Sequence, residues 1–242
     1  SEFLKTVKDE ELAETMLLLQ GRAFPVWDER TIGIADKSLV KAIALATGLP
    51  AEDVEKMWKS TGDLGDATAQ CISTKKQVTL FSEHLTAKKV LDNLQKTAEL
   101  EGERTVDRKI QLIAELLTSA APDEARYIVR TFLEDLRMGT GDSCIRDAIM
   151  RSCFADKIGI KYDEQQNDLM LDDTKREEYN KYVQIVQDAY DLSQDFAHVA
   201  SLARQGISAL QNITLQPGKP VKVMLALKVS SVEDGFKEAG KH

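Results

Sequence analysis

The chain has 242 residues with 32 basic and 40 acidic side chains, a formal net charge of −8, and 43% hydrophobic residues. It is long enough to bury a large core as one domain or two. It has no apolar run of about 18 residues and no hydrophobic signal core at its N-terminus, so we expect a soluble, intracellular protein without membrane spans. Three histidines and three cysteines without C-x-x-C spacing argue against a metal site and a disulfide framework.

The acidic charge is concentrated in one segment. Between Lys161 and Ala200, four basic residues face ten acidic ones, which gives −6 of the total of −8. The rest of the chain is therefore nearly neutral. A basic surface that binds nucleic acid remains compatible with this acidic chain.

Helical periodicity dominates the sequence as far as Gln205. Prolines and glycines are few, five and thirteen, and apolar residues recur at intervals of three and four, as in helices that bury one face. Thr6, Thr86 and Thr105 are candidate helix caps. We therefore predict an all-α protein. The predicted helices run from Thr6 to Gln20, Asp36 to Thr47, Pro50 to Ser60, Thr86 to Glu101, Lys175 to Ala189 and Asp191 to Gln205, with others starting at Thr105 and Pro122.

Two segments depart from the helical pattern. The passage from Ala155 to Asp173 is irregular and acidic, and we interpret it as a surface excursion, with a short hairpin as one alternative. After Gly206 the composition shifts to β-branched residues with Pro217 and Pro220, which indicates a boundary near residue 216. We predict a helical domain over residues 1–216 and a short extended segment over 217–242.

The stretch 127–154 has the pattern of a helix, a glycine turn and a second helix. Ile128, Phe132 and Leu136 recur four residues apart and therefore predict one buried face of the first helix. Arg130 and Arg137 fall on other sides of that helix. We expect the helix to reach Leu136.

The turn Gly139-Thr140-Gly141 leads into the second helix, which either Asp142 or Ser143 can cap. A glycine turn that enters a helix presents unpaired N–H groups and the positive end of the helix dipole, which favour an anion. Arg137 before the turn and Arg146 after it would flank a phosphate there. The alternative is that the two glycines only end one helix and begin the next.

Two other helix starts have related features. Residues 61–66, Thr-Gly-Asp-Leu-Gly-Asp, form a second glycine-bearing turn that opens a helix. Arg108 and Lys109 lie in the first turn of the helix predicted from Thr105. Basic residues are unfavourable at a helix N-terminus unless an anion joins them, so this placement favours a bound phosphate.

The segment from Ser73 to Glu83, STKKQVTLFSE, is apolar in its middle and polar at both ends. One interpretation buries Leu80 and Phe81 in the core. The other makes the segment an exposed linear motif, in which Gln77 and the Leu80-Phe81 pair anchor a partner.

Two regions of the chain resemble each other. RTIGIADKSLVKAI, from Arg30, matches LRMGTGDSCIRDAI, from Leu136, in a basic residue, a glycine turn and the start of a helix. More weakly, GDLGDATAQCI, from Gly62, matches YDLSQDFAHVA, from Tyr190. A duplication would give two helical halves about a pseudo-two-fold axis, which suits a ligand with its own dyad, such as duplex DNA.

Six blocks of the sequence, in one order, resemble the N-terminal DNA-binding domain of ATP-dependent DNA ligases of the archaeal and eukaryotic type. The likeness covers residues 17–226 and is weakest over 156–182. It implies an all-helical domain of two pseudo-symmetric halves that grips the minor groove of nicked DNA through backbone amides and basic side chains at glycine turns. The blocks are DERTIGIADKSLVKAIALATG, STGDLGDATAQ, LTAKKVLDNLQKTAELEG, DRKIQLIAELL, DEARYIVRTFLEDLRMGTGDSCIRDAI and PGKPVKVMLA.

The resemblance also implies particular contacts. KKQVTLF resembles the shortened motif with which archaeal ligases bind the PCNA sliding clamp, which assigns that role to Gln77, Leu80 and Phe81. The implied DNA contacts are Gly62, Leu64, Gly65, Thr105, Arg108, Lys109, Arg137, Gly139, Thr140, Gly141, Ser143 and Arg146.

The end of the chain resembles the start of the adenylation domain in these ligases. PGKPVKVMLA matches its lead-in, although Val223 stands where the family tends to have proline. The family's catalytic signature is Lys-x-Asp-Gly, whereas the one Asp-Gly after this lead-in, Asp234-Gly235, has Val232 in place of the lysine. We therefore expect no catalytic residue and no cofactor in these 242 residues, with ATP and Mg²⁺ needed by the full-length enzyme.

The sequence thus predicts a monomer that binds nicked double-stranded DNA without reading its sequence, as part of a ligase of replication, repair and recombination. We expect a cytoplasmic, nucleoid-associated protein if the source is archaeal and a nuclear one if it is eukaryotic. The alternative is an α-helical protein-interaction scaffold whose acidic surface meets a basic partner. An autonomous enzyme is disfavoured because the sequence has no Gly-x-x-x-x-Gly-Lys phosphate loop and few histidines.

Overall fold

The computed structural model describes residues 1–74, 84–100, 102, 105–139, 141–163, 168–170 and 172–218, with only the backbone for 161–163 and 168–170. Gln77, Leu80, Phe81 and Thr140 lie outside these residues, as does most of the segment predicted to be extended, 217–242. The elements are α1 (Glu2–Thr6), the 3-10 helix η1 (Asp9–Glu11), α2 (Leu12–Leu19), α3 (Asp36–Thr47), α4 (Ala51–Thr61), α5 (Leu64–Ser73), α6 (Ala87–Glu99), α7 (Thr105–Ser119), α8 (Pro122–Phe132), α9 (Asp142–Ile158), β1 (Lys161–Asp163), β2 (Asp168–Met170), α10 (Asp173–Ser193), α11 (Phe196–Gln205) and α12 (Ile207–Gln211).

The prediction of an all-α protein is confirmed, with one addition. β1 and β2 pair antiparallel, with Tyr162 opposite Leu169, so the hairpin alternative for the acidic passage is correct. In the described part of the chain, no helix is both long and apolar enough to cross a membrane.

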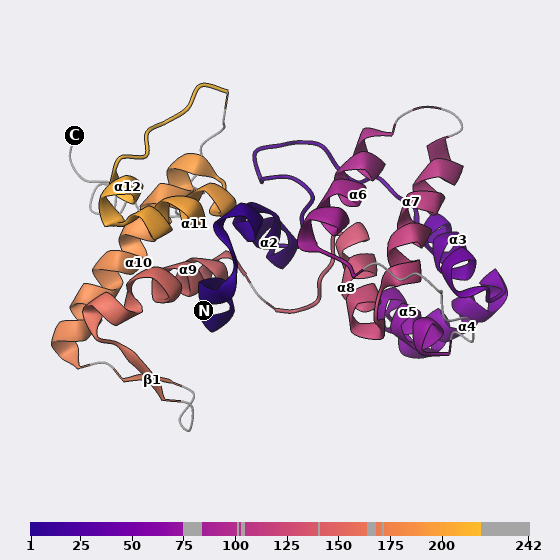
Figure 1. Ribbon diagram of the computed structural model, residues 1–242, viewed down its shortest axis with the longest axis horizontal. Coiled ribbons are helices and arrows are strands. Elements are labelled where there is room, and N and C mark those ends of the chain that lie inside the picture. The colour runs from indigo at the N-terminus through magenta and orange to yellow at the C-terminus, as the bar shows by residue number, and fades with distance from the viewer. Residues whose placement is uncertain are drawn as a thin grey trace, which may run out of the picture.

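The helices form two bodies, each with its own hydrophobic core (Figure 1). The first body contains α3 to α8, and Leu39, Ile43, Leu94, Ile113 and Leu117 lie at the centre of its core. The second contains α9 to α12 together with α1 and α2, because Leu4, Leu12 and Met16 pack with Phe154 and Tyr190. The N-terminal helices therefore complete the body formed by the C-terminal part of the chain.

The chain crosses between the bodies twice, and the two crossings touch at Gly21. Gly21, just after α2, has a φ of +67°, and a Cβ placed on it would lie 2.5 Å from Cγ of Leu136 in the return connection. Glycine is therefore required here both by its backbone conformation and by the lack of space. The expectation that Leu136 extends a helical face was wrong, since α8 ends at Phe132 and Leu136 packs in the connection instead.

Several predicted caps differ from those in the structure. Thr86 caps α6 by accepting from the Lys89 N–H, as expected. Thr6 ends α1 instead of starting a long helix, and the Thr105 hydroxyl, inside α7, donates to the Gly102 carbonyl at 2.8 Å. Gly141 occupies the cap position of α9 with no side-chain cap, so neither Asp142 nor Ser143 serves there.

The first internal match has a counterpart in local backbone structure. Gly33 and Gly139 both have positive φ, +57° and +64°, and each lies three residues before the aspartate that begins a helix, α3 or α9. The second match is not in register with the structure. Asp63 caps α5 and Asp195 caps α11, whereas the sequence alignment pairs Asp63 with Asp191. The duplication and its two-fold axis stay predictions.

We predict that Gly65→Ala destabilises the first body. A Cβ at Gly65 would lie 2.8 Å from the Arg126 carbonyl oxygen of α8, so the added methyl must push two packed helices apart. Overpacking of this kind costs about 1–3 kcal/mol, which corresponds to a fall of several degrees in the melting temperature followed by circular dichroism.

Gly141→Ala is the matched control, because a Cβ there meets no atom within 4 Å and φ is −90°. An unchanged melting temperature for Gly65→Ala would contradict the close packing of α5 on α8.

Candidate nucleic-acid interface

Two of the predicted phosphate-binding turns lie side by side in the structure. Gly62, which ends α4 with a φ of +71°, precedes Asp63 at the cap of α5. Arg137, from the connection that leads to Gly139, places Nη1 3.5 Å from the Gly62 carbonyl oxygen and 3.1 Å from Asp63 Oδ2. Turns that are 75 residues apart in sequence therefore form one surface, which we call the composite turn, residues 62–66 with 137–139.

A buried carboxylate lies at the centre of the composite turn. Asp63 is 6% exposed, and its Oδ1 accepts the Asp66 N–H at 2.7 Å and the Arg130 guanidinium at 3.2 Å. Burial alone would raise the pKa of the Asp63 carboxyl. The hydrogen bonds from Asp66 and Arg130, with the charges of Arg130 and Arg137, outweigh burial and hold that pKa below its ordinary value.

Arg130 and Arg126 extend this charge network along α8. Arg130 Nη2 lies 3.1 Å from Asp66 Oδ1, and Arg126 Nε lies 2.7 Å from the same oxygen. Two aspartates of α5 are therefore balanced by three arginines, Arg137 included. The sequence contains a signal for this network. Arg126 and Arg130 lie four residues apart, on one face of α8, and Asp63 and Asp66 lie three residues apart, on one face at the start of α5.

Arg137 is the exposed member of the network. Its side chain is 52% exposed, and its Nε also lies 2.8 Å from Oδ2 of the exposed Asp135. The hydrogen bond that Arg137 donates to Asp135, followed by the charges of Asp135 and Asp63, raises the pKa of Arg137, so the guanidinium is positive at every relevant pH. Its backbone has a φ of +52°, which is uncommon for a residue with a side chain and typical of functional sites.

Leu64 and Gly65 are buried at the start of α5 and expose no side chain on this surface. The Leu64 side chain is 2% exposed and belongs to the core, and Gly65 is buried against α8. The first N–H groups of a helix have no acceptor within the helix. Any contact of residues 64 and 65 with an anion therefore falls on main-chain N–H groups.

The predicted partner of Arg137 is held elsewhere. Arg146 Nε donates to Asp147 at 2.8 Å and Nη1 donates to Gln187 of α10 at 3.1 Å. Within the described residues no contact joins Arg146 to Arg137, so the structure does not show the pair flanking one phosphate. Ser143 is exposed in the first turn of α9.

The third predicted site lies at another end of the first body. Figure 1 shows α7 starting at the top of that body, whereas α4 and α5 lie at the bottom. Arg108 is exposed there and Lys109 is partly buried, and neither forms an ion pair with a described residue. These residues and the composite turn are therefore separate points on the same body.

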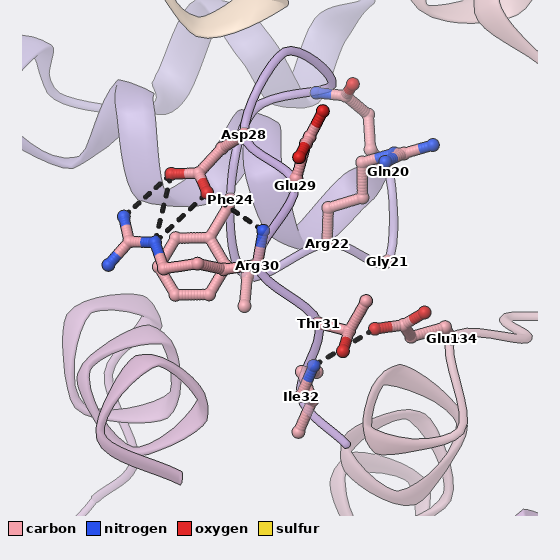
Figure 2. A pocket seen from close by; sticks show the side chains of 11 residues that line it. Gln20, Gly21, Arg22, Phe24, Asp28, Glu29, Arg30, Thr31, Ile32 and Glu134 are labelled. Carbon is pink, nitrogen blue, oxygen red and sulfur yellow. Dashed lines mark hydrogen bonds and ion pairs between the residues drawn. The ribbon is translucent and has the colours of Figure 1, made fainter. Parts of the chain in front are cut away.

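A polar cavity of about 240 Å³ lies where the chain leaves α2 (Figure 2). Of its charged residues, Arg30 and Asp28 form an ion pair with each other. Arg30 stacks 3.9 Å above the Phe24 ring and binds both oxygens of Asp28, while Glu134 accepts the Ile32 N–H at 3.3 Å. Arg30 and Glu134 thus have structural partners in the cavity wall. Among the described residues, no cluster of histidine, cysteine and acidic side chains is suited to a metal ion.

Comparisons with known proteins agree with this geometry. The family model described as DNA ligase N terminus matches residues 1–150. The DNA ligase of Thermococcus fumicolans is 38% identical over 99% of this chain, and that of Methanothermobacter thermautotrophicus is 36% identical over all of it. The DNA ligase of Archaeoglobus fulgidus is 32% identical over 98% of the chain.

This chain spans 38–39% of the length of these curated relatives. The family model, by contrast, covers more than half of the chain, and the first core and the composite turn lie within the matched residues. The chain belongs to the DNA ligase N-terminus family.

Proposed function

We propose that this chain binds nicked duplex DNA without reading its sequence, as the DNA-gripping part of an ATP-dependent DNA ligase. The observation that carries the proposal is the composite turn, where two helix-entering turns and an exposed arginine converge in a protein of this family. The start of α7, with Arg108 and Lys109, supplies a second point of contact.

The chemistry of these points suits phosphate better than bases. Backbone N–H groups at a helix start and an arginine with several donors both match phosphate oxygens. Such contacts position a protein on the duplex and carry no sequence information. The minor groove, whose pattern of donors and acceptors is degenerate, adds little discrimination, which suits an enzyme that must seal any sequence.

The acidic net charge is compatible with this proposal because the charges are segregated. The segment 161–200, with its net charge of −6, contains β1, β2, α10 and the first half of α11. The composite turn belongs to α4, α5 and the connection after α8, outside that segment. A positive DNA-facing surface and an acidic α10 can coexist on one molecule.

The remaining parts of the proposal concern the full-length protein. ATP and Mg²⁺ would serve domains outside these residues, and Gln77, Leu80 and Phe81 would contact the PCNA clamp. We place the protein in the cytoplasm of an archaeon, associated with the nucleoid, and expect it to act as a monomer.

Binding to DNA should depend steeply on salt. A fluorescein-labelled nicked duplex titrated with this chain should show saturable anisotropy at 50 mM salt. Affinity should fall as salt rises, with a slope of log K against log [salt] of about −0.9 per phosphate engaged. Duplexes of unrelated sequence should bind equally. Absence of binding to nicked DNA at low salt would overturn the proposed function.

Replacing Arg137 should remove one phosphate contact. We expect Arg137→Ala to weaken binding by roughly tenfold. The slope of log K against log [salt] should become less negative by about 0.9, the contribution of one phosphate contact. Arg176→Ala, which removes the same charge from the exposed face of α10, is the matched control and should leave both values unchanged. Equal effects of the two substitutions would show that only net charge matters and would contradict a role for the composite turn.

These residues alone should not seal a nick. The sequence contains no Lys-x-Asp-Gly, so no lysine of that signature is present to accept AMP. Incubation with ATP, Mg²⁺ and nicked duplex should yield neither adenylated protein nor joined strand on a denaturing gel. Joined product that depends on ATP would contradict this expectation, and a full-length relative provides the positive control.

A further inference from the structure

Asp63 is an unexpected residue at a phosphate-binding turn, because a carboxylate repels a phosphate. Capping α5 does not require the charge, since asparagine, serine and threonine are also good N-caps. The Asp63 side chain is 8% exposed and contacts Arg130 and Arg137 in addition to the Asp66 N–H. Its negative charge therefore acts on the two arginines as well as on the cap.

The two arginines are held in different ways. Arg130 is 12% exposed and bridges Asp63 and Asp66, so it fixes the start of α5 against α8 and balances the buried charge. Arg137 is half exposed, and Asp63 is its one buried carboxylate partner among the described residues, Asp135 being 54% exposed. The position of the Arg137 guanidinium over the Gly62 turn thus depends on Asp63.

We propose that Asp63 is a positioning residue for DNA binding, which holds the Arg137 guanidinium over the Gly62 turn at the start of α5, with Arg130 as its buried counter-ion. The inference rests on the proposed function. An arginine that is already ordered loses less rotamer freedom when a phosphate arrives. Arg137 uses Nε and Nη1 in its contacts with Asp135, Gly62 and Asp63, which leaves Nη2 of this half-exposed side chain without a hydrogen-bond partner among the described residues.

The direction of the effect of Asp63→Asn tests the proposal. Asparagine keeps the cap and removes the charge. If Asp63 affected DNA binding only by electrostatic repulsion of the phosphates, removing its negative charge would tighten binding. If it positions Arg137, binding to nicked duplex should weaken by about three- to tenfold. Asp53→Asn, which removes an exposed charge paired with Lys56 on α4, is the matched control and should bind like the parent or slightly more tightly.

A double-mutant cycle separates positioning from general damage to the fold. In the Arg137→Ala background, Asp63→Asn should no longer weaken binding, because the group that it positions is gone. A loss of the same size in both backgrounds would indicate a purely structural role and would overturn the proposal. Unchanged or tighter binding by Asp63→Asn in the parent background would also overturn it.

Arg130→Lys provides a second test if Asp63→Asn loses helical content in circular dichroism. Lysine keeps the charge, but one ammonium cannot replace the guanidinium that bridges Asp63 and Asp66. We expect weaker binding that again disappears in the Arg137→Ala background, and an unchanged affinity would refute the proposal. Failure of the parent chain to bind DNA would instead refute the proposed function, so the two failures are distinguishable.

Discussion

The buried ion pair between Asp63 and Arg130 is the interaction on which the candidate site depends. It joins the first turn of α5 to the middle of α8, and α5 packs against α8 so closely that position 65 has no room for a side chain. Breaking a buried ion pair by removing one partner costs about 3–5 kcal/mol when the other is left alone, and less here, because Arg130 also contacts Asp66 and Asp63 also contacts Arg137. Because α8 leads directly into the connection that holds Arg137, the same pair sets the distance between the two turns.

The second constraint is the double crossing of the chain between the bodies. Leu12 and Met16 pack in the second core although the residues after Gly21 enter the first. The return connection passes Gly21 with Leu136 against it, so the start of that connection is fixed on both sides, by Gly21 and by Asp63. A backbone held at both points can keep Glu134 and Arg137 at positive φ, a conformation that a free loop would rarely adopt.

The sequence predicted the features that depend on local periodicity and failed where tertiary contacts decide. Asp36 to Thr47 was predicted with its bounds, because apolar spacing and Gly48 mark both the face and the end. The helix predicted from Thr6 to Gln20 is shorter in the structure, since Asp9–Glu11 form a 3-10 turn and α2 spans only Leu12–Leu19. The glycine turns were recognised from composition and from family resemblance. The network around the buried Asp63 could not be predicted from periodicity. Periodicity shows that a charged residue lies on a helix, whereas the burial of Asp63 follows only from the packing of α5 against α8.

Segregation of charge explains how an acidic chain can carry a surface for DNA. Asp63, Asp66 and Asp135 are matched by three arginines, of which Arg137 is the most exposed. A single exposed cation gives a weak contact by itself, because solvent and salt screen it. Binding by this family member therefore requires several such points at once, each on a rigid helix start. The packed helices of the first body hold the proposed points, the composite turn and the start of α7, at a fixed separation, which a flexible basic segment of equal charge would not do.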